Sequence, residues 1–341
     1  MCDKKQSSKG DDEMKKIRWG IAGPGAIAHK FAKAVKNVDC AELVAVASRS
    51  EQNARSFADK YDIPLSFCGY ENMAVSDKVD AVYISTPHPF HISCAELFMK
   101  HGKHVLCEKP LCVNASQAEY LKKCASDNGV FLMEAMWTRF LPAVIESQRL
   151  VSEGIIGDIK GIEADFCYSS SPEQEAKLFQ NHMAGGSLLD VGVYGLHFVS
   201  MFLGSSPQTV AAVADVSDGA DLHTNVLLKY QNGALASVSS AIDVYKPESA
   251  YIYGTDGYMH FPLFYGANEF YIVKDGKREH ICKPSMGEGL EEEIIEVCRC
   301  IASGDCESKI LPLDETIAVI KLMDKIREQI NLKYPHDADT N

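Results

Sequence analysis

Residues 23–28 read G-P-G-A-I-A, a glycine-rich loop of the G-x-G-x-x-G/A pattern that binds the pyrophosphate of dinucleotides. In this pattern Gly23 permits a tight turn and Gly25 lets the pyrophosphate approach the backbone, so the phosphates lie at the N-terminus of the next helix. The loop follows an apolar segment over 17–22 and begins a helical one, which is the context that the pattern requires. The sequence therefore predicts a dinucleotide site built on Gly23, Gly25, Ala26 and Ile27.

The residues after the second predicted strand indicate which dinucleotide binds. An acidic side chain there would hydrogen-bond the adenosine ribose and favour NAD(H). This sequence has Ser48, Arg49 and Ser50 instead, and a guanidinium forks well onto the oxygens of a 2′-phosphate. The alternative interpretation of Arg49 is a solvated loop arginine. We predict NADP(H) as the cofactor, in preference to NAD(H).

Lys109 is a candidate for the chemical step because of its place after an apolar segment over 104–107, which reads as a strand. Ligands of open α/β folds bind at the carboxyl ends of such strands. The alternative is an exposed loop lysine, which Glu108 and Pro110 on either side make the weaker interpretation.

A second group of candidates lies on an apolar segment over 188–203 that reads as a helix. Asp190 and Tyr194 are four residues apart and share one face, with His197 one turn further along. An aspartate on so apolar a helix needs a partner. The Gly185-Gly186 pair before the helix would let the substrate or the nicotinamide approach the backbone. A packing role is the preferred interpretation of His197, which stays among the substrate candidates.

The elements that position these residues change in type along the chain. Up to Met136, apolar strands alternate with helices, which predicts a parallel sheet covered on both faces. After Met136 the predicted strands are longer and joined by turn signals, which indicates an antiparallel or mixed sheet. Strands are expected at 17–22, 43–47, 81–85, 104–107, 130–133, 155–168, 209–216, 224–230, 234–241 and 249–254. Helices are expected at 29–35, 52–61, 91–100, 115–127, 188–203, 288–303 and 314–331.

Composition excludes several classes of function. The net charge is −13, so neither nucleic acid nor an anionic membrane is expected as a partner. The 12 cysteines are scattered without a CxxC pair, which favours reduced thiols in a cytoplasmic protein and lacks the ligand spacing of zinc sites. No apolar run approaches the roughly 20 residues that span a bilayer. The arm over residues 1–14 is polar, unlike a signal peptide, and is expected to be disordered.

Three more segments resemble those of a known family: STPHPFH over 85–91, EKP over 108–110 and GGSLLDVGVY over 185–194. Their order and spacing are similar to those of the glucose–fructose oxidoreductase, inositol dehydrogenase and rhizopine-catabolism (Gfo/Idh/MocA) family. EAMWTRFLP over 134–142 resembles the branch of dimeric dihydrodiol dehydrogenases and NADP-dependent D-xylose 1-dehydrogenases.

This resemblance covers the chain from Ile17 to Asn331 and implies an α/β protein of two domains. A Rossmann domain with a parallel sheet would span 15–136. An α+β domain with an open-faced, mainly antiparallel sheet would span 137–331, followed by a C-terminal tail over 332–341. Members commonly dimerise through the open sheet, so a homodimer is expected.

The resemblance also implies roles for the candidates. It places Lys109 beside the nicotinamide and the substrate hydroxyl, before a cis peptide bond to Pro110. Tyr194 would pass a proton to or from the substrate oxygen, and the Lys109 ammonium is expected to lower its pKa from about 10. Asp190 would bind the substrate or hold Lys109. The expected activity is an NADP-dependent oxidoreductase acting on a D-xylose-like sugar or a trans-dihydrodiol.

The remaining candidates come from the same loops. Trp137 and Arg139 lie at the crossing between the domains and either line the substrate pocket or pack the interface. His88 and His91 are three apart, but no acidic or cysteine partner lies at ligand spacing, so no metal is expected. The cofactor candidates in these loops are Thr86, Pro87, His88, His91, Glu108 and Lys109. The substrate candidates are Trp137, Arg139, Asp190, Tyr194 and His197.

Two other functions fit parts of this pattern. A redox-cycling glycosidase uses the same fold with bound NAD, but Arg49 and Tyr194 argue against it. A non-enzymatic NADPH sensor would keep the Rossmann half alone, and the presence of Lys109, Asp190 and Tyr194 argues against that.

Overall fold

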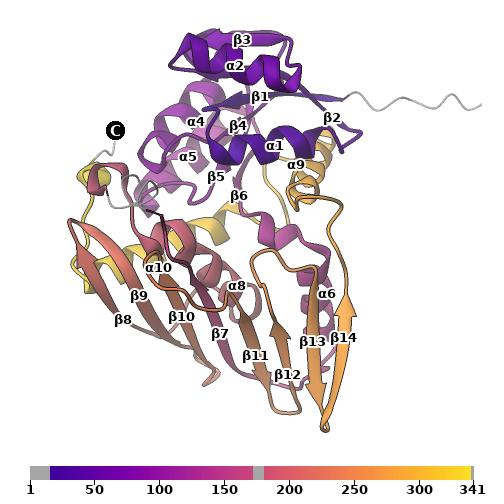
Figure 1. Cartoon of the computed structure of the whole chain (residues 1–341), viewed down its shortest axis with the longest axis vertical. Helices are drawn as coiled ribbons and strands as arrows, with labels where there is room; N and C mark the ends of the chain where they lie inside the picture. Colours follow the sequence, from indigo (N-terminus) through magenta and orange to yellow (C-terminus); the bar gives the residue numbers. More distant parts are fainter. Residues whose placement is uncertain (1–15, 172–179, 339–341) are drawn as a thin grey trace, which may run out of the picture.

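The computed structural model describes residues 16–171 and 180–338, which form two units stacked one above the other in Figure 1. The predicted arm over 1–14 lies outside the described residues. The upper unit is built on a parallel sheet and the lower unit on a mixed sheet. The predicted fold class is therefore confirmed.

The first sheet has six parallel strands in the order β3-β2-β1-β4-β5-β6, the arrangement of a Rossmann domain. All four residues of β4 are buried, as expected for a strand with helices on both faces. The strand order reverses between β1 and β4, so the loops there flank a ligand-binding crevice. The strands are β1 (Ile17–Ala22), β2 (Ala41–Ser48), β3 (Leu65–Cys68), β4 (Ala81–Ile84), β5 (His104–Glu108) and β6 (Leu132–Ala135). The helices are α1 (Ala26–Val35), α2 (Glu51–Tyr61), α3 (Glu71–Ala74), η1 (His88–Phe90), α4 (His91–Lys100) and α5 (Ala115–Asn128).

The second sheet has eight strands in the order β14-β13-β12-β11-β7-β10-β9-β8. Only β7 and β10 pair in parallel, and the other neighbours are antiparallel, as predicted. The prediction missed the three strands after β11. The strands are β7 (Ile159–Cys167), β8 (Thr209–Ser217), β9 (Ala220–Lys229), β10 (Leu235–Ala241), β11 (Ala250–Gly254), β12 (Tyr258–Phe261), β13 (Glu269–Lys274) and β14 (Lys277–Cys282).

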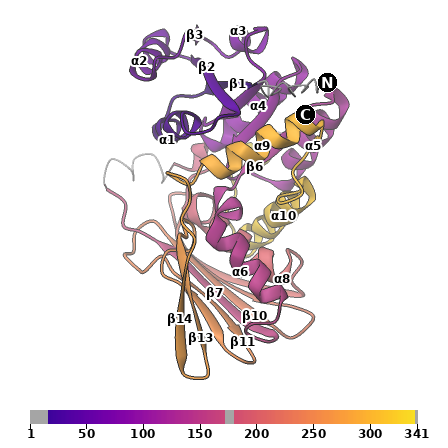
Figure 2. The ribbon, with the colours of Figure 1, turned by 90° about the vertical axis from the view of Figure 1, so that its right-hand side faces the viewer.

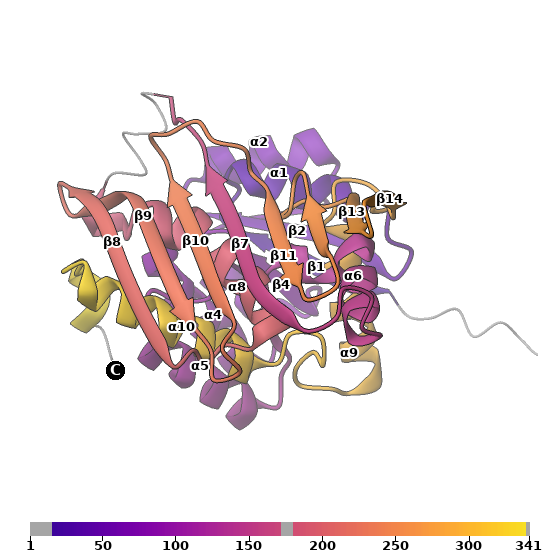
Figure 3. The same ribbon diagram turned by 90° about the horizontal axis from the view of Figure 1, so that it is seen from below.

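One face of the second sheet is covered by α6 (Pro142–Ser152), α8 (Val193–Leu203) and α10 (Leu313–Gln329), as the edge-on view in Figure 2 shows. Figure 3 looks onto the opposite face, over which none of the described helices lies. That face exposes large apolar side chains, because Val213 is 71%, Leu227 62% and Leu235 58% exposed. The expected open-faced sheet is present.

Helix α9 (Glu291–Ser303) returns from the second sheet to the first unit, where it packs against α1 and β2 (Figures 1 and 2). Asn37 Nδ2 donates a hydrogen bond of 2.9 Å to Glu291 Oε1 at this contact. The sequence-based division assigned everything from 137 to 331 to the second domain. In space, the first sheet is completed by a helix from that later segment.

The segment Asn181–Leu203 has the length and hydropathy of a membrane-spanning helix. The prediction that no apolar run approaches the length needed to span a bilayer was therefore wrong. The segment comprises the short turn η3 (Asn181–Met183), a π-helical turn η4 (Leu188–Gly192) and α8. It is 72% buried within the structure over its most apolar window. We interpret it as a core segment, because α8 packs against β7 and β10.

Residues 332–338, predicted to be part of a tail, are packed against the second unit. Tyr334 is 4% exposed, and its hydroxyl donates a hydrogen bond of 2.9 Å to the carbonyl of Gly185. Arg327 at the end of α10 holds Asp337 at 3.0 Å. This segment therefore supports the chain just before η4.

Candidate active site

A cleft of about 630 Å³ opens at the point where the order of the first sheet reverses. Its lining comes from both units, with residues at or after the ends of β1 to β5 on one side and the start of the η4–α8 segment on the other. It brings together most of the predicted site residues. Its lining is Gly23, Pro24, Gly25, Ala26, Ile27, Ser48, Arg49, Asn53, Tyr70, Ser85, Thr86, Pro87, His88, His91, Glu108, Lys109, Asp190 and Tyr194.

The glycine loop connects β1 to α1 at the floor of this cleft. Gly23 has φ +89°, and a Cβ there would approach the amide nitrogen of Thr86 to 3.1 Å, so a side chain at this position would be strained and crowded. Helix α1 begins at Ala26, earlier than predicted, and no side chain caps it at Gly25. Its first turn contains no acidic residue, so its amides and positive dipole end remain available to an anion.

Arg49 lies at the end of the cleft, just after β2. It is exposed and makes no ion pair among the described residues, and its guanidinium lies over the Phe90 ring at 5.6 Å. A second hollow, of about 450 Å³, shares Arg49 with the cleft and continues along α4. Ser50 caps α2 by accepting a hydrogen bond of 3.3 Å from the amide of Asn53, so Asn53, and not Ser50, lines the cleft.

Lys109 reaches from the end of β5 to Asp190 on the second unit. Its Nζ lies 3.0 Å from Asp190 Oδ1 and also donates to the Asp190 carbonyl. The peptide bond from Lys109 to Pro110 is cis, as expected. Burial lowers the pKa of Lys109, but neighbouring groups, Asp190 first among them, together outweigh it and raise the pKa above its usual range. The lysine is therefore a cation in the cleft.

Asp190 holds a second partner that sequence reasoning missed. The Tyr168 hydroxyl, just after β7, donates a hydrogen bond of 2.9 Å to Asp190 Oδ2. Burial raises the pKa of Asp190, but Lys109 more than offsets it, so the pKa lies below its usual value. No local spacing relates positions 168 and 190, because the sheet brings them together.

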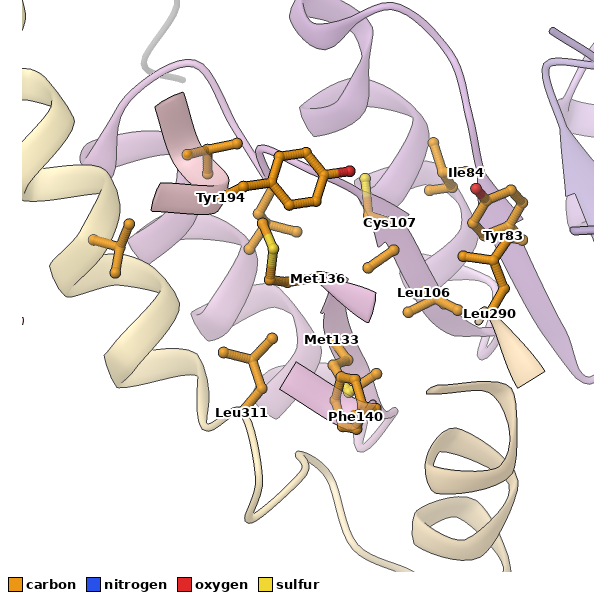
Figure 4. Packing of buried hydrophobic residues seen from close by; sticks show 14 of the residues in the cluster. Tyr83, Ile84, Leu106, Cys107, Met133, Met136, Phe140, Tyr194, Leu290 and Leu311 are labelled. Carbon is orange, nitrogen blue, oxygen red and sulfur yellow. The ribbon is translucent and has the colours of Figure 1, made fainter. Parts of the chain in front are cut away.

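Tyr194 extends from α8 toward Cys107 at the end of β5, as Figure 4 shows. Its hydroxyl accepts a hydrogen bond of 3.2 Å from Trp137 Nε1, and Lys109 Nζ lies 5.1 Å from its ring centre. The expectation of a lowered pKa was wrong. Burial raises the pKa of Tyr194 to about 12 and outweighs the lowering effect of Lys109. The Tyr194 hydroxyl is therefore neutral at neutral pH.

Asp190 and Tyr194 lie on different kinds of turn, because the expected helix over 188–203 begins with the π-helical turn η4. Such turns occur frequently at functional sites. Asp221 holds this turn by accepting hydrogen bonds from the Leu188 amide at 2.8 Å and the Ser187 hydroxyl at 2.7 Å. It also fills the space beside Gly186, where a Cβ would lie 2.1 Å from Asp221 Oδ1. Gly186 therefore leaves room for the Asp221 side chain, whereas the sequence analysis expected the substrate or the nicotinamide beside this glycine.

His88 begins the short turn η1 after β4, and His91 is the first residue of α4. His91 has no exposed surface, and its ring nitrogens lie 2.9 Å from the Pro110 carbonyl and 2.7 Å from the Thr86 carbonyl. It thus ties the Lys109 loop to the loop that carries Thr86. His88 Nδ1 lies 3.2 Å from the Ala184 carbonyl, and burial, with His91 nearby, lowers the pKa of His88 to about 4.

Arg139 and His197, kept as substrate candidates, do not line the cleft. They are 3% and 0% exposed, respectively, and Arg139 Nε lies 3.2 Å from His197 Nδ1. Arg139 also pairs with Glu315 and donates a hydrogen bond of 2.7 Å to the Ser200 hydroxyl. Both residues therefore pack the interior, which was the alternative interpretation. His197 follows Tyr194 by three helical residues, so its side chain points about 60° away from that of Tyr194. Trp137 contacts the Tyr194 hydroxyl, so of the pair at the domain crossing it alone touches the site.

Comparisons with known proteins agree with this arrangement. The model of an oxidoreductase family with an NAD-binding Rossmann fold matches residues 17–136, and that of the GFO/IDH/MocA C-terminal domain matches residues 144–260. The chain belongs to the GFO/IDH/MocA oxidoreductase family. The resemblance read from the motifs is confirmed, and membership makes the chain an NAD(P)-dependent oxidoreductase.

Among GFO/IDH/MocA relatives, trans-1,2-dihydrobenzene-1,2-diol dehydrogenase of Mus musculus is 34% identical over 94% of this chain and 99% of the relative. The same enzyme of Homo sapiens is 32% identical over the same shares. Among solved structures, the 3-ketoreductase KijD10 of Actinomadura kijaniata, in complex with NADP and TDP-benzene, is 26% identical. It superposes with a TM-score of 0.84 over 93% of this chain and 98% of KijD10.

Proposed function

We propose that this protein is an NADP(H)-dependent oxidoreductase that interconverts a hydroxyl and a carbonyl on a small cyclic substrate, a sugar or a trans-dihydrodiol. The observation that carries the proposal is the meeting of Lys109, Asp190 and Tyr194 in one cleft with the glycine loop. Two of these residues come from the second unit and one from the first. This arrangement supports a proton-transfer role for Tyr194 next to the proposed cofactor site.

The cleft fits a dinucleotide phosphate. The uncapped N-terminus of α1 offers amides to the pyrophosphate. Among the described residues, a hypothetical Cβ on Gly25 would have only the Ser85 carbonyl within 4 Å, at 3.8 Å. Arg49, with no carboxylate partner among the described residues, supplies positive charge where a 2′-phosphate would lie. NADP is also the dinucleotide in the KijD10 complex. When bound, the nicotinamide supplies the redox step.

The chain's own residues handle the proton. Tyr194 is neutral, so it donates its hydroxyl proton to a carbonyl oxygen in reduction and accepts it back in oxidation. Lys109 carries a positive charge within 5.1 Å of the ring, which stabilises the phenolate as it forms. Asp190 fixes the Lys109 ammonium at 3.0 Å. Trp137 orients the Tyr194 hydroxyl through its indole hydrogen bond.

Aromatic rings beside Tyr194 support a cyclic substrate. Phe166 and Tyr265 stack with ring centres 4.0 Å apart, and both lie within 5.7 Å of the Tyr194 ring centre. Trp137 meets Tyr265 edge-on at 6.1 Å. Flat rings of this kind pack against the C–H face of a pyranose or the ring of a dihydrodiol. The names of the relatives include trans-1,2-dihydrobenzene-1,2-diol dehydrogenase, which is named for a cyclic diol.

We also propose a homodimer formed through the open face of the second sheet. Besides the exposed apolar side chains of β8–β10, this face has a row of stacked rings that runs across β11–β14. Tyr251 stacks on His260 at 4.3 Å, and Tyr271 stacks on His280 at 4.8 Å. Aromatic and apolar groups of this extent are typical of protein interfaces.

A spectrophotometric screen tests the activity. Absorbance at 340 nm is followed with NADP⁺ or NAD⁺ against aldoses, polyols and trans-dihydrodiols, and the active pair is then used for variants. Tyr194→Phe and Lys109→Met should each lower kcat by about 10²–10⁴-fold while NADPH still binds. Tyr230→Phe is the matched control, because Tyr230 is 5% exposed and lies at the far end of β9.

Turnover close to that of the wild type in both site variants would refute the assigned roles. Tight NADPH binding with no turnover on any substrate would favour the sensor alternative. Cleavage of nitrophenyl glycosides without added cofactor would favour the glycosidase.

A further inference from the structure

Glu134 is a buried carboxylate that the proposed reaction does not use. It lies in β6 beside Cys107 of β5, and none of its surface is exposed. An ionised group at such a depth is costly unless several donors satisfy it. Its partners therefore indicate what it does.

One oxygen of Glu134 holds the loop that carries Lys109. Oε1 accepts a hydrogen bond of 3.0 Å from the amide of Leu111, two residues after Lys109. The other oxygen holds two helices of the second unit. Oε2 accepts a hydrogen bond of 3.0 Å from the Thr316 hydroxyl on α10 and lies 3.0 Å from His197 Nε2 on α8.

The proton on His197 is fixed by Arg139. An arginine only donates, so the His197 Nδ1 that lies 3.2 Å from Arg139 Nε must accept. The ring proton is then on Nε2, the nitrogen that lies 3.0 Å from Glu134 Oε2. Burial raises the pKa of Glu134, but His197 and the other donors outweigh it, and burial lowers the pKa of His197. The pair is therefore a carboxylate facing a neutral imidazole.

We propose that Glu134 is a positioning residue, whose two oxygens hold the Lys109 loop and the Tyr194 helix in register across the interface between the units. His197 lies one turn after Tyr194, and Leu111 two residues after Lys109, so one side chain connects both halves of the site. This inference rests on the proposed function, because Lys109 and Tyr194 are its reacting pair. Arg139 acts through His197 by fixing the direction of its proton.

Glu134→Gln tests this at nearly constant volume. A glutamine has one acceptor oxygen, whereas the Leu111 amide and His197 Nε2 both present donors to the two ends of the carboxylate. One of the two connections is therefore lost whichever way the amide lies. Because a displacement of about 1 Å at a reacting group costs about 100-fold, kcat should fall by about 10–100-fold with NADPH affinity unchanged.

A matched control separates positioning from general loss of a buried carboxylate. Glu296 is 7% exposed and accepts hydrogen bonds from Ser308 and Arg299, away from the cleft. Glu296→Gln should lower stability and leave kcat unchanged. If Glu134→Gln does not fold, a second pair of variants at His197 tests the same proposal. His197→Gln keeps an acceptor for Arg139 and a donor for Glu134 and should retain most activity, whereas His197→Leu should lose it.

Hydrogen exchange gives a readout that needs no turnover. A peptide over 106–114 contains the Leu111 amide, and it should exchange faster in Glu134→Gln than in the wild type or in Glu296→Gln. If the wild type turns over no substrate, the proposed function fails. Hydrogen exchange at the Leu111 amide still tests whether Glu134 holds the Lys109 loop.

Three results would overturn the inference. The first is a folded Glu134→Gln variant with wild-type kcat and wild-type exchange. The second is an equal loss of kcat in Glu296→Gln. The third is a His197→Gln variant as impaired as His197→Leu.

Discussion

Gly186 is expected to tolerate no side chain. Its φ is +125°, and a Cβ there would lie 2.1 Å from Asp221 Oδ1 and 3.0 Å from the Asp221 amide. A backbone conformation reserved for glycine costs a side chain about 1–3 kcal/mol. Overlap with Asp221 adds the roughly 1–3 kcal/mol typical of overpacking, so Gly186→Ala should lower the free energy of unfolding by about 2–6 kcal/mol.

Gly204→Ala is the matched control for the backbone term. Gly204 has φ +79°, and a Cβ there would meet no other described residue within 4 Å. Gly204→Ala should lower the free energy of unfolding only by the conformational cost, roughly 1–3 kcal/mol. Urea denaturation followed by far-ultraviolet circular dichroism measures both variants, and fluorescence titration measures NADPH binding in the folded state.

The comparison decides why the glycine is there. If Gly186 makes room for Asp221, Gly186→Ala is the less stable variant, and its folded fraction binds NADPH normally. If Gly186 instead makes room for a ligand, the two variants have equal stability, and Gly186→Ala alone weakens binding of cofactor or substrate. That second result would refute the reasoning from Asp221.

Two other predictions concern the cofactor and the assembly. Arg49→Ala should weaken NADPH binding by about 10–100-fold, the loss expected for charge-assisted hydrogen bonds, and should leave NADH binding unchanged. Fluorescence titration measures both affinities. Arg55→Ala is the control, because the Arg55 side chain is 69% exposed. An equal effect on both cofactors would count against a 2′-phosphate contact. Leu227→Glu should convert a dimer to monomers in light scattering, because a charge would enter the apolar part of the open face. Val75→Glu, at a residue 68% exposed on the first unit, should remain dimeric, and dissociation of both would contradict the assignment of the interface.

The first sheet was the most predictable part of the fold, for physical reasons. Its strands are short apolar runs between helices, and β1 and α4 were predicted with their observed bounds. β3 was missed because its four residues alternate between half-buried and exposed at the edge of the sheet. In the second sheet, β14 was missed because its first four residues are polar, and none of its six residues is buried.

The site was predictable where residues carry local signals and not where the fold supplies the neighbour. Lys109 was found from its place after a strand. Tyr168 was missed because it reaches Asp190 only through the second sheet. The pKa of Tyr194 was assigned the wrong direction because the family resemblance implies a nearby charge, Lys109, but not the depth of burial, which dominates here.

Helix α9 has a consequence for how the protein folds. The hydrogen bond between Asn37 and Glu291 joins residues 254 positions apart, and Ile294 and Val297 of the same helix are fully buried. While the ribosome is still making the second sheet, the first sheet lacks this cover and presents apolar surface to solvent. Contacts of such long range form late and slowly. Residues 17–136 are therefore one domain by sequence but depend on the rest of the chain to finish folding.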